Sequence, residues 1–216
     1  MFEYDCITSE EVQVLRNGLE TLNISVSEKS LDQAIQYLDL LEKWNGAINL
    51  TAIRERNRML PLHLMDSWSL APFLKESDSL LDVGSGGGFP GIPVALIRPD
   101  LSITLMESNQ KKVAFLKQAK IELNLSNLEI IGERVEQSTP SKLFNTITCR
   151  AFSDLSEFVR ATRHLLQKGG EWIAMKGAIP YDEINRLPAG ISTTITPIQI
   201  PGLKAERHLI HLRSAI

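Results

Sequence analysis

Apolar residues recur at two different spacings along the 216-residue chain, and the spacing changes near residue 75. Before that point the spacing is three or four residues, which is typical of amphipathic helices. Two such stripes begin near Thr8 and Ser30: Val12, Leu15, Leu19 and Leu22, then Leu31, Ala34, Ile35, Leu38 and Leu41. The second stripe should stop near Asn45-Gly46, and a third, less regular helix should run from about Arg54 to Leu70 with an interruption at Pro61. The pattern predicts an N-terminal helical extension over residues 1–75.

After Lys75, short apolar strands alternate with helices. The predicted strands cover residues 79–83, 102–107, 128–131, 144–149 and 171–176, and helices are expected around 113–123 and 155–166. Such alternation predicts parallel strands joined by helical crossovers. Two further strand-like runs, 191–200 and 207–213, form a closing hairpin-like pair that a dinucleotide-binding domain does not need. We therefore predict an α/β domain over residues 76–216, with a mostly parallel Rossmann-like sheet, one antiparallel strand near the C-terminus, and helices on both faces.

Composition indicates the cellular compartment of the protein and the kinds of partner that it could bind. Cys6 and Cys149 lie too far apart to suggest a disulfide framework or a metal site, which favours a reducing compartment. The acidic N-terminus does not resemble a leader peptide, and no apolar run approaches the length of a membrane span, so we expect a cytoplasmic protein that does not contact membranes. The net charge is −3, but residues 1–50 carry nine acidic and three basic side chains, which leaves the remainder at +3. This asymmetry permits a surface that binds a polyanion, although a mixed solvated surface is its commoner cause.

The stretch SLLDVGSGGGFPG at residues 79–91 is the candidate cofactor-binding turn, and it has two possible interpretations. Gly86, Gly88 and Gly91 match the dinucleotide fingerprint G-x-G-x-x-G after a strand, which would make the chain a nicotinamide-dependent oxidoreductase. The same residues also read Asp82-x-Gly84-x-Gly86-x-Gly88, the first motif of Rossmann-like methyltransferases. A pyrophosphate needs free backbone N–H groups, whereas S-adenosylmethionine brings a cationic sulfonium and an ammonium. The carboxylate of Asp82 favours the second ligand.

Glu107 ends the second predicted strand about 20 residues after the turn, where an acidic side chain can accept both hydroxyls of a ribose. Both candidate ligands contain adenosine, so Glu107 supports a nucleoside without identifying it. Phe89-Pro90 occupies the position where a dinucleotide turn prefers a small residue, which again favours the methyl donor.

Several segments in fixed order resemble one bacterial family. LLDVGSGGGFPGIPVAL, MESNQKKVAFLKQ, GERVEQ and TCRAFSDL, together with the upstream WNGAINLTAIRERNRMLPLHLMDSW, are similar to ribosomal RNA small subunit methyltransferase G, also called glucose-inhibited division protein B. The resemblance runs from about Trp44 to Gly177. It implies a class I methyltransferase sheet and transfer of a methyl group from S-adenosylmethionine to the N7 atom of a guanine in a 16S ribosomal RNA loop.

The resemblance also implies which residues bind the cofactor. The family's positions map onto Gly84, Phe89, Val135, Glu136 and Arg150, and the physical interpretation of the turn adds Asp82, Gly86 and Glu107. Relatives often carry a proline where this chain has Gly87, so the turn departs from the family pattern there. The backbone can still approach a ligand closely without it.

Guanine N7 carries a lone pair and no proton, so no general base is required and we predict no catalytic nucleophile. Methyltransferases of exocyclic amines commonly carry an Asn/Asp-Pro-Pro-aromatic turn where this chain has Cys149-Arg150-Ala151-Phe152. Cys149 superficially offers the thiolate that cytosine C5 methylation needs, but it lies within an apolar strand, where cysteine acts as a small hydrophobic residue.

Several charged residues are candidates for other contacts. Arg150 is expected at the ligand-binding edge of the sheet, in an ion pair with a carboxylate such as Glu136, and Lys176 is expected as a solvated lysine at a strand end. Candidates for contact with RNA phosphates are Arg54, Arg58, Lys111, Lys112 and Lys176.

The four histidines share no ligand spacing with acidic or cysteine partners, so no metal is expected. A third possibility is a non-catalytic ribosome-assembly module. The weak net charge suggests that 16S ribosomal RNA is the partner within the 30S subunit or an assembly intermediate.

Overall fold

The computed structural model describes residues 9–76, 78–139, 142–150, 152 and 154–214. Cys6, the helix start near Thr8 and Ala151 lie outside these ranges. Within them, no helix is long and apolar enough to cross a membrane.

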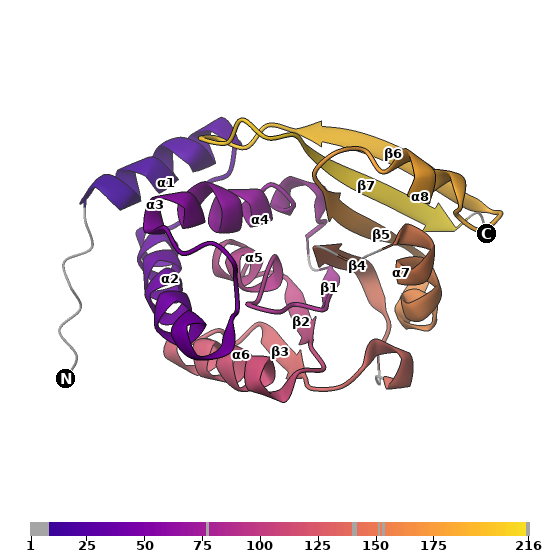
Figure 1. Cartoon of the computed structure of the whole chain (residues 1–216), viewed down its shortest axis with the longest axis horizontal. Coiled ribbons are helices and arrows are strands. Elements are labelled where there is room, and N and C mark those ends of the chain that lie inside the picture. The colour runs from indigo at the N-terminus through magenta and orange to yellow at the C-terminus, as the bar shows by residue number, and fades with distance from the viewer. Residues whose placement is uncertain (1–8, 77, 140–141, 151, 153, 215–216) are drawn as a thin grey trace.

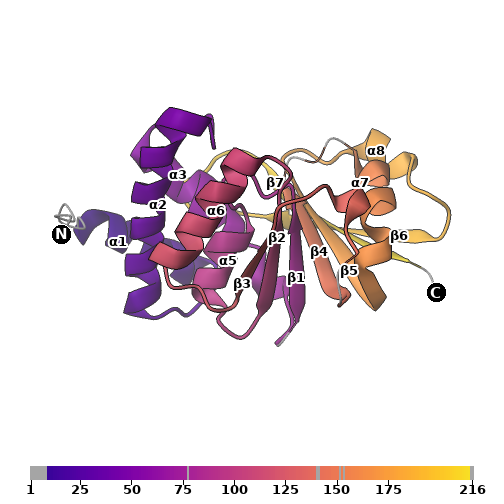
Figure 2. The same cartoon turned by 90° about the horizontal axis from the view of Figure 1, so that it is seen from below.

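A seven-stranded sheet forms the centre of the molecule (Figures 1 and 2). Its strands are β1 (Ser79–Val83), β2 (Ser102–Met106), β3 (Leu128–Ile131), β4 (Phe144–Arg150), β5 (Leu166–Lys176), β6 (Ile191–Ile198) and β7 (Arg207–Ser214), in the order β3-β2-β1-β4-β5-β7-β6. The first five strands pair in parallel, and β7 pairs antiparallel with both β5 and β6. The predicted mostly parallel sheet with one antiparallel strand is therefore confirmed.

Helices cover both faces of this sheet, and Figure 2 shows the two layers on either side of it. On one side of the sheet, α5 (Gly91–Ile97) and α6 (Gln110–Glu122) lie next to the strands and α4 (Asp66–Trp68) packs on α5, while α2 (Glu28–Ile48) packs on α5 and α6 from outside and α1 (Ser9–Thr21) packs on α2. On the other side lie α7 (Leu155–Thr162) and α8 (Tyr181–Asn185), as Figure 2 shows. Neighbouring residues of β1 point to opposite faces, so Leu80 packs in the first layer and Leu81 in the second. Asp82 follows this alternation and lies under α5, where it reaches Gly91.

The N-terminal helices pack directly on the sheet domain. Leu15 of α1 and Leu38 of α2 belong to the same buried cluster as Leu105 of β2 and Leu209 of β7. The boundary between residues 75 and 76 remains a prediction.

The structure corrects the predicted end of the second helix. α2 continues past Asn45-Gly46 to Ile48, and the left-handed residue that ends it is Asn49, with φ 48°. Asn45 is buried within the helix, and its side chain bonds both backbone groups of Thr51, at 2.9 and 3.0 Å. Asn45 therefore holds the chain segment that follows the helix, instead of ending it.

The predicted interruption at Pro61 takes the form of a π-helical turn. α3 (Arg56–Met59) leads into the π-helix η1 (Leu60–Met65), and α4 follows without a break. Pro61 lacks a backbone N–H, which a regular α-helix would need at that position. The part of the chain that the structure describes also contains three short 3₁₀ turns: η2 (Ala71–Phe73), η3 (Val135–Gln137) and η4 (Arg163–Leu165). The helix predicted over residues 155–166 is shorter than expected: α7 ends at Thr162, η4 follows it, and β5 begins at Leu166.

Candidate functional site

The glycine turn between β1 and α5 depends on glycine at alternate positions. Gly84, Gly86 and Gly88 have φ of 70°, 56° and 92°, a region that residues with a Cβ rarely adopt. Gly91 is required for a different reason, because a Cβ there would run into the Leu105 side chain and lie 2.9 Å from Oδ2 of Asp82. Tyr37 of α2 is fully buried and donates a hydrogen bond to the Gly87 carbonyl, so the N-terminal part of the chain supports this turn.

Four glycine N–H groups of this turn, those of Gly84, Gly86, Gly88 and Gly91, already have partners within the protein. Gly84 donates to the Met106 carbonyl at 2.8 Å, and Gly88 donates to the Ser85 carbonyl at 2.7 Å. Gly86 donates to Oε2 of Glu107 and Gly91 to Oδ2 of Asp82, both at 2.9 Å. A pyrophosphate at this place would compete with two carboxylates for the same donors and would be repelled by them. The geometry therefore disfavours a dinucleotide.

Asp82 is the group that suits a cation. Its side chain is fully buried, and one carboxylate oxygen accepts the bond from Gly91. The other oxygen, Oδ1, has no hydrogen-bond partner among the described residues. Burial raises the pKa of Asp82 to about 7, against the bond from Gly91 and the positive charge of Arg150. An unpartnered carboxylate oxygen at the carboxyl end of β1 fits the ammonium or sulfonium end of S-adenosylmethionine.

Glu107 lies one residue beyond β2 and is 8 % exposed. Its oxygens accept from Gly86 N–H at 2.9 Å and from Asn109 N–H at 2.8 Å, which fixes the orientation of the carboxylate. Each oxygen keeps a further lone pair, so the carboxylate can still accept two ribose hydroxyls. Gly86 and Glu107 are thus brought together as neighbours, about 20 residues apart in sequence.

Phe89 and Arg150 form a second part of the site. The Arg150 guanidinium carbon lies 4.4 Å from the centre of the Phe89 ring, which places a cation over an aromatic face. The predicted ion pair of Arg150 with a nearby carboxylate is confirmed, but its partner is Asp66, at 3.4 Å, and not Glu136. Glu136 is exposed in η3, whereas its neighbour Val135 is buried. A sequence pattern could not show that residues 84 positions apart would meet here.

His63 is a residue of this site that the sequence did not single out. Its ring stacks on Phe89 with centres 4.3 Å apart, and its Nε2 lies 2.9 Å from Oγ1 of Thr51. Nδ1 is buried without a partner among the described residues. Burial, together with the charge of Arg150, lowers the pKa of His63 to about 4, so the imidazole is neutral at physiological pH. The sequence does contain an indication of this role, because His63 and Asp66 are polar and lie three residues apart in an otherwise apolar helical run.

Cys149 is free and buried, and burial raises the pKa of its thiol well above the ordinary value. A thiolate nucleophile is therefore disfavoured at this position. The described residues include no group of three or more His, Cys, Asp or Glu side chains that could hold a metal ion.

The RNA-contact candidates differ in their surroundings. Arg54 and Lys111 are exposed, Lys112 is half-buried, and Arg58 is exposed with Glu55 at 3.6 Å. Lys176 is not the solvated lysine that the sequence predicts. Its ammonium lies 2.8 Å from Glu183 and 3.1 Å from the Phe152 carbonyl, with a side chain only 13 % exposed. Contact of Lys176 with RNA would have to break this pair, whereas Arg54 and Lys111 are accessible.

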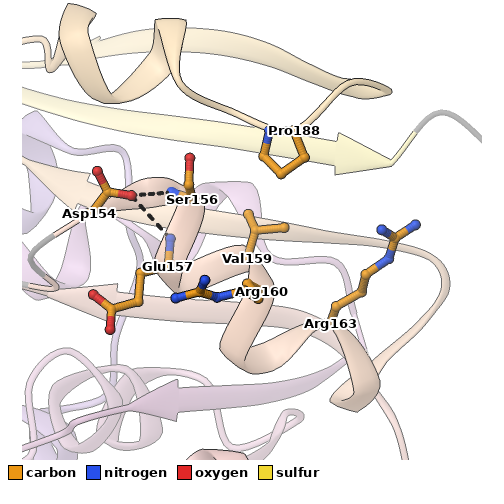
Figure 3. Close-up of a pocket in the computed structure, with 7 residues that line it drawn as sticks. All are labelled: Asp154, Ser156, Glu157, Val159, Arg160, Arg163 and Pro188. Atoms are coloured by element: carbon orange, nitrogen blue, oxygen red, sulfur yellow. Dashed lines mark hydrogen bonds between the residues drawn. The ribbon is translucent and has the colours of Figure 1, made fainter.

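A pocket of about 610 Å³ opens on the surface beside α7, away from the glycine turn. Asp154 caps this helix by accepting from the N–H groups of Ser156 and Glu157, at 2.8 and 3.1 Å. In Figure 3, Arg160 extends back toward Glu157 while Arg163 points away from it. The two guanidinium groups do not converge, so the pocket lacks the paired cations of a phosphate site.

Comparisons with known proteins decide between the two interpretations of the glycine turn. The family model described as rRNA small subunit methyltransferase G matches residues 30–210. The chain belongs to the rRNA small subunit methyltransferase G family. Ribosomal RNA small subunit methyltransferase G of Laribacter hongkongensis is 51 % identical over 92 % of this chain and 96 % of its own length. The proteins of the same name from Chromobacterium violaceum and Neisseria gonorrhoeae are 49 % and 46 % identical, over 92 % and 94 % of this chain and 95 % and 98 % of their own lengths.

Solved structures agree on the fold of this family member. A glycopeptide N-methyltransferase superimposes with a TM-score of 0.59 at 13 % identity, over 71 % of this chain and 97 % of that one. A SAM-dependent methyltransferase from Aquifex aeolicus gives 0.55 at 16 % identity, over 73 % and 93 %. The predicted class I methyltransferase sheet is confirmed. The predicted class of enzyme, an S-adenosylmethionine-dependent methyltransferase of small-subunit ribosomal RNA, is also confirmed, and the oxidoreductase alternative is not supported.

Proposed function

We propose that this chain transfers the methyl group of S-adenosylmethionine to the N7 atom of a guanine in 16S ribosomal RNA. The observation that carries the proposal is the buried carboxylate of Asp82, which has one oxygen without a partner among the described residues, beside a glycine turn in which four glycine N–H groups are already bonded. This arrangement suits a cationic adenosine cofactor and disfavours an anionic one.

The residues of the site divide among the parts of the cofactor. Asp82 binds the cationic amino-acid end, and Glu107 accepts the ribose hydroxyls. Gly84 and Gly86 allow the backbone to approach because they carry no Cβ. The remaining positions of the proposed set come from the family resemblance: Phe89, Val135, Glu136 and Arg150.

The methyl transfer requires the protein to position the two reacting groups and to provide a suitable electrostatic environment. When bound, S-adenosylmethionine supplies an activated methyl group. Guanine N7 presents a lone pair without a proton, so no side chain has to act as a base. The protein contributes by holding N7 in line with the methyl carbon. His63 is neutral and Cys149 protonated, which agrees with a mechanism that uses neither a base nor a nucleophile.

Methyl transfer in vitro tests this proposal. Purified protein and S-adenosylmethionine are incubated with 30S subunits that lack the modification, and modified nucleotides are mapped by mass spectrometry. We expect one new N7-methylguanine in 16S ribosomal RNA, and Asp82→Asn should abolish its formation. Asp32→Asn, at an exposed position of α2, is the matched control and should leave it unchanged. Methylation of an exocyclic amine or of cytosine would refute the proposed chemistry.

The state of the RNA is a separate part of the proposal. We infer that the enzyme acts in the cytoplasm on RNA within the 30S subunit or an assembly intermediate, because a net charge of −3 gives no long-range attraction to naked RNA. Methylation of the 30S particle should greatly exceed that of a short stem-loop. Equal rates on both would contradict this inference.

Arg54, Arg58 and Lys111 are the exposed candidates for phosphate contact, and Arg58 also lies 3.6 Å from Glu55, so Arg54 and Lys111 are the simpler pair to test. If each neutralises one phosphate, the plot of log affinity against log salt has a negative slope, and the magnitude of this slope should fall by about 0.9 or less when either residue is replaced by glutamine. Lys29→Gln, at an exposed position of α2, should leave the slope unchanged. An unchanged slope in the Arg54 and Lys111 variants would exclude these contacts.

A further inference from the structure

Asp66 joins three distant parts of the chain beside the proposed cofactor site. It is the first residue of α4, directly after the π-helical turn, and its side chain is 6 % exposed. Oδ1 accepts from Nε of Arg207 at 2.9 Å, and Oδ2 lies 3.4 Å from Nη1 of Arg150. Arg207 is the first residue of β7, and Arg150 the last of β4, so both arginines lie at the carboxyl edge of the parallel strands.

The π-helical turn holds Arg150 and Phe89 by separate contacts. The Leu62 carbonyl accepts from Nη1 of Arg150 at 3.1 Å, and Asp66 pairs with the same nitrogen. His63, between them in sequence, stacks on the Phe89 ring. An arginine side chain has many rotamers, and fixing one of them costs entropy that the contacts must offset. The carboxylate of Asp66 is the charged member of this set.

We propose that Asp66 is a positioning residue for the cofactor: it acts through Arg150 by holding that guanidinium over the Phe89 ring. The inference rests on the proposed function, which makes Phe89 and Arg150 cofactor contacts. Among the described residues, the contacts that Arg150 keeps without this carboxylate are the hydrogen bond to the Leu62 carbonyl and the weak attraction of an aromatic face. The guanidinium then samples orientations that do not bind, and the affinity for the cofactor falls.

Arg207 provides a matched control for this proposal. It shares the Asp66 carboxylate with Arg150, but its further hydrogen bond goes to the Glu206 carbonyl, on the hairpin between β6 and β7. Replacing Arg207 removes the shorter of the two ion pairs of Asp66, while the contact of Arg150 with Phe89 stays in place. A purely structural role for Asp66 would make the Asp66 and Arg207 variants behave alike.

The experiment measures binding of S-adenosylhomocysteine by titration calorimetry, and the Arg150 Nε–H resonance of the ligand-free protein by NMR. The variants are Asp66→Asn, Arg207→Gln, Arg150→Gln and the double variant of Asp66 and Arg150. We expect Asp66→Asn to weaken binding about tenfold and to remove the ring-current shift from the Arg150 signal, since contacting residues couple at this scale. Arg207→Gln should change binding less than about twofold and keep that shift. In the Arg150→Gln background, Asp66→Asn should have no further effect.

The outcomes separate the two proposals. If Asp66→Asn keeps the Arg150 shift and the wild-type affinity, or if Arg207→Gln weakens binding as much as Asp66→Asn, the positioning role is overturned. If the wild type itself does not bind S-adenosylhomocysteine, the proposed function fails, while the NMR comparison still decides whether Asp66 orients Arg150. Should Asp66→Asn not fold, Asp66→Glu takes its place, because the longer side chain moves the carboxylate relative to Arg150, and the same criteria apply.

Discussion

Raising the pH should strengthen cofactor binding through the ionisation of Asp82. A cation at this site requires the charged carboxylate, but burial raises the pKa of Asp82 to about 7 in the ligand-free protein. At about pH 6 most molecules therefore carry a neutral Asp82 and must lose a proton before they bind. His63 does not compete in this range, because its pKa is lowered to about 4.

The size of the effect follows from the ionised fraction. With a pKa of about 7, roughly one tenth of the molecules are ionised at about pH 6 and roughly nine tenths at about pH 8, so the dissociation constant should fall about tenfold between them. The same shift acts on folding. Because the folded-state pKa of Asp82 lies above its ordinary value of 3.8, its contribution to the free energy of unfolding is fully present below that value. It is lost as the pH rises through about 7, so the ligand-free protein should lose stability over this range.

Titration calorimetry with S-adenosylhomocysteine, which keeps the ammonium, measures both the affinity and the proton release. Repeating the titration in two buffers of different ionisation enthalpy should show close to one proton released per ligand at about pH 6, and few at about pH 8. The titration of the free ligand is measured separately and subtracted. Asp82→Asn should bind weakly at both pH values without releasing this proton. Equal affinities of the wild type at both pH values, or the same pH dependence in Asp82→Asn, would refute the reasoning.

Further predictions concern the packing around the site. Gly91→Ala should lower the free energy of unfolding by about 1–3 kcal/mol in urea, because its Cβ would collide with Leu105, whereas Gly46→Ala, with nothing within 4 Å inside α2, should raise it by up to about 1 kcal/mol. Equal changes in the two variants would contradict the close approach seen at Gly91. Lys176→Met should destabilise the protein by leaving Glu183 unpaired, and Glu183→Gln in the same chain should restore part of the loss; additive effects in thermal unfolding would show that the pair is not coupled.

The sequence predicted the part of the site that follows from local pattern. Apolar runs place the strand ends, and parallel strands bring their carboxyl ends together, so Asp82, Glu107 and Arg150 could be assigned to one edge of the sheet. The Asp-x-Gly-x-Gly-x-Gly spacing also identified the turn, in which the structure shows positive φ at Gly84, Gly86 and Gly88.

The sequence could not predict which side chains would meet from distant segments. Arg150 had several carboxylates available, and Asp66 is its partner because the π-helical turn carries it to the sheet edge. Lys176 appeared solvated because α8, which brings Glu183 to it, is only five residues long and carries little periodic signal. The end of α2 was misplaced because Gly46 looked like a stop signal, whereas buried contacts of Asn45 decide the path of the chain.

A crystal structure with S-adenosylhomocysteine bound tests the central claim most directly. The account predicts that the ligand's ammonium lies within hydrogen-bond distance of Asp82 and that its ribose hydroxyls lie on Glu107, with the amides of the glycine turn bonded as they are here. A ligand found elsewhere, or a turn whose amides open to bind a pyrophosphate, would contradict it.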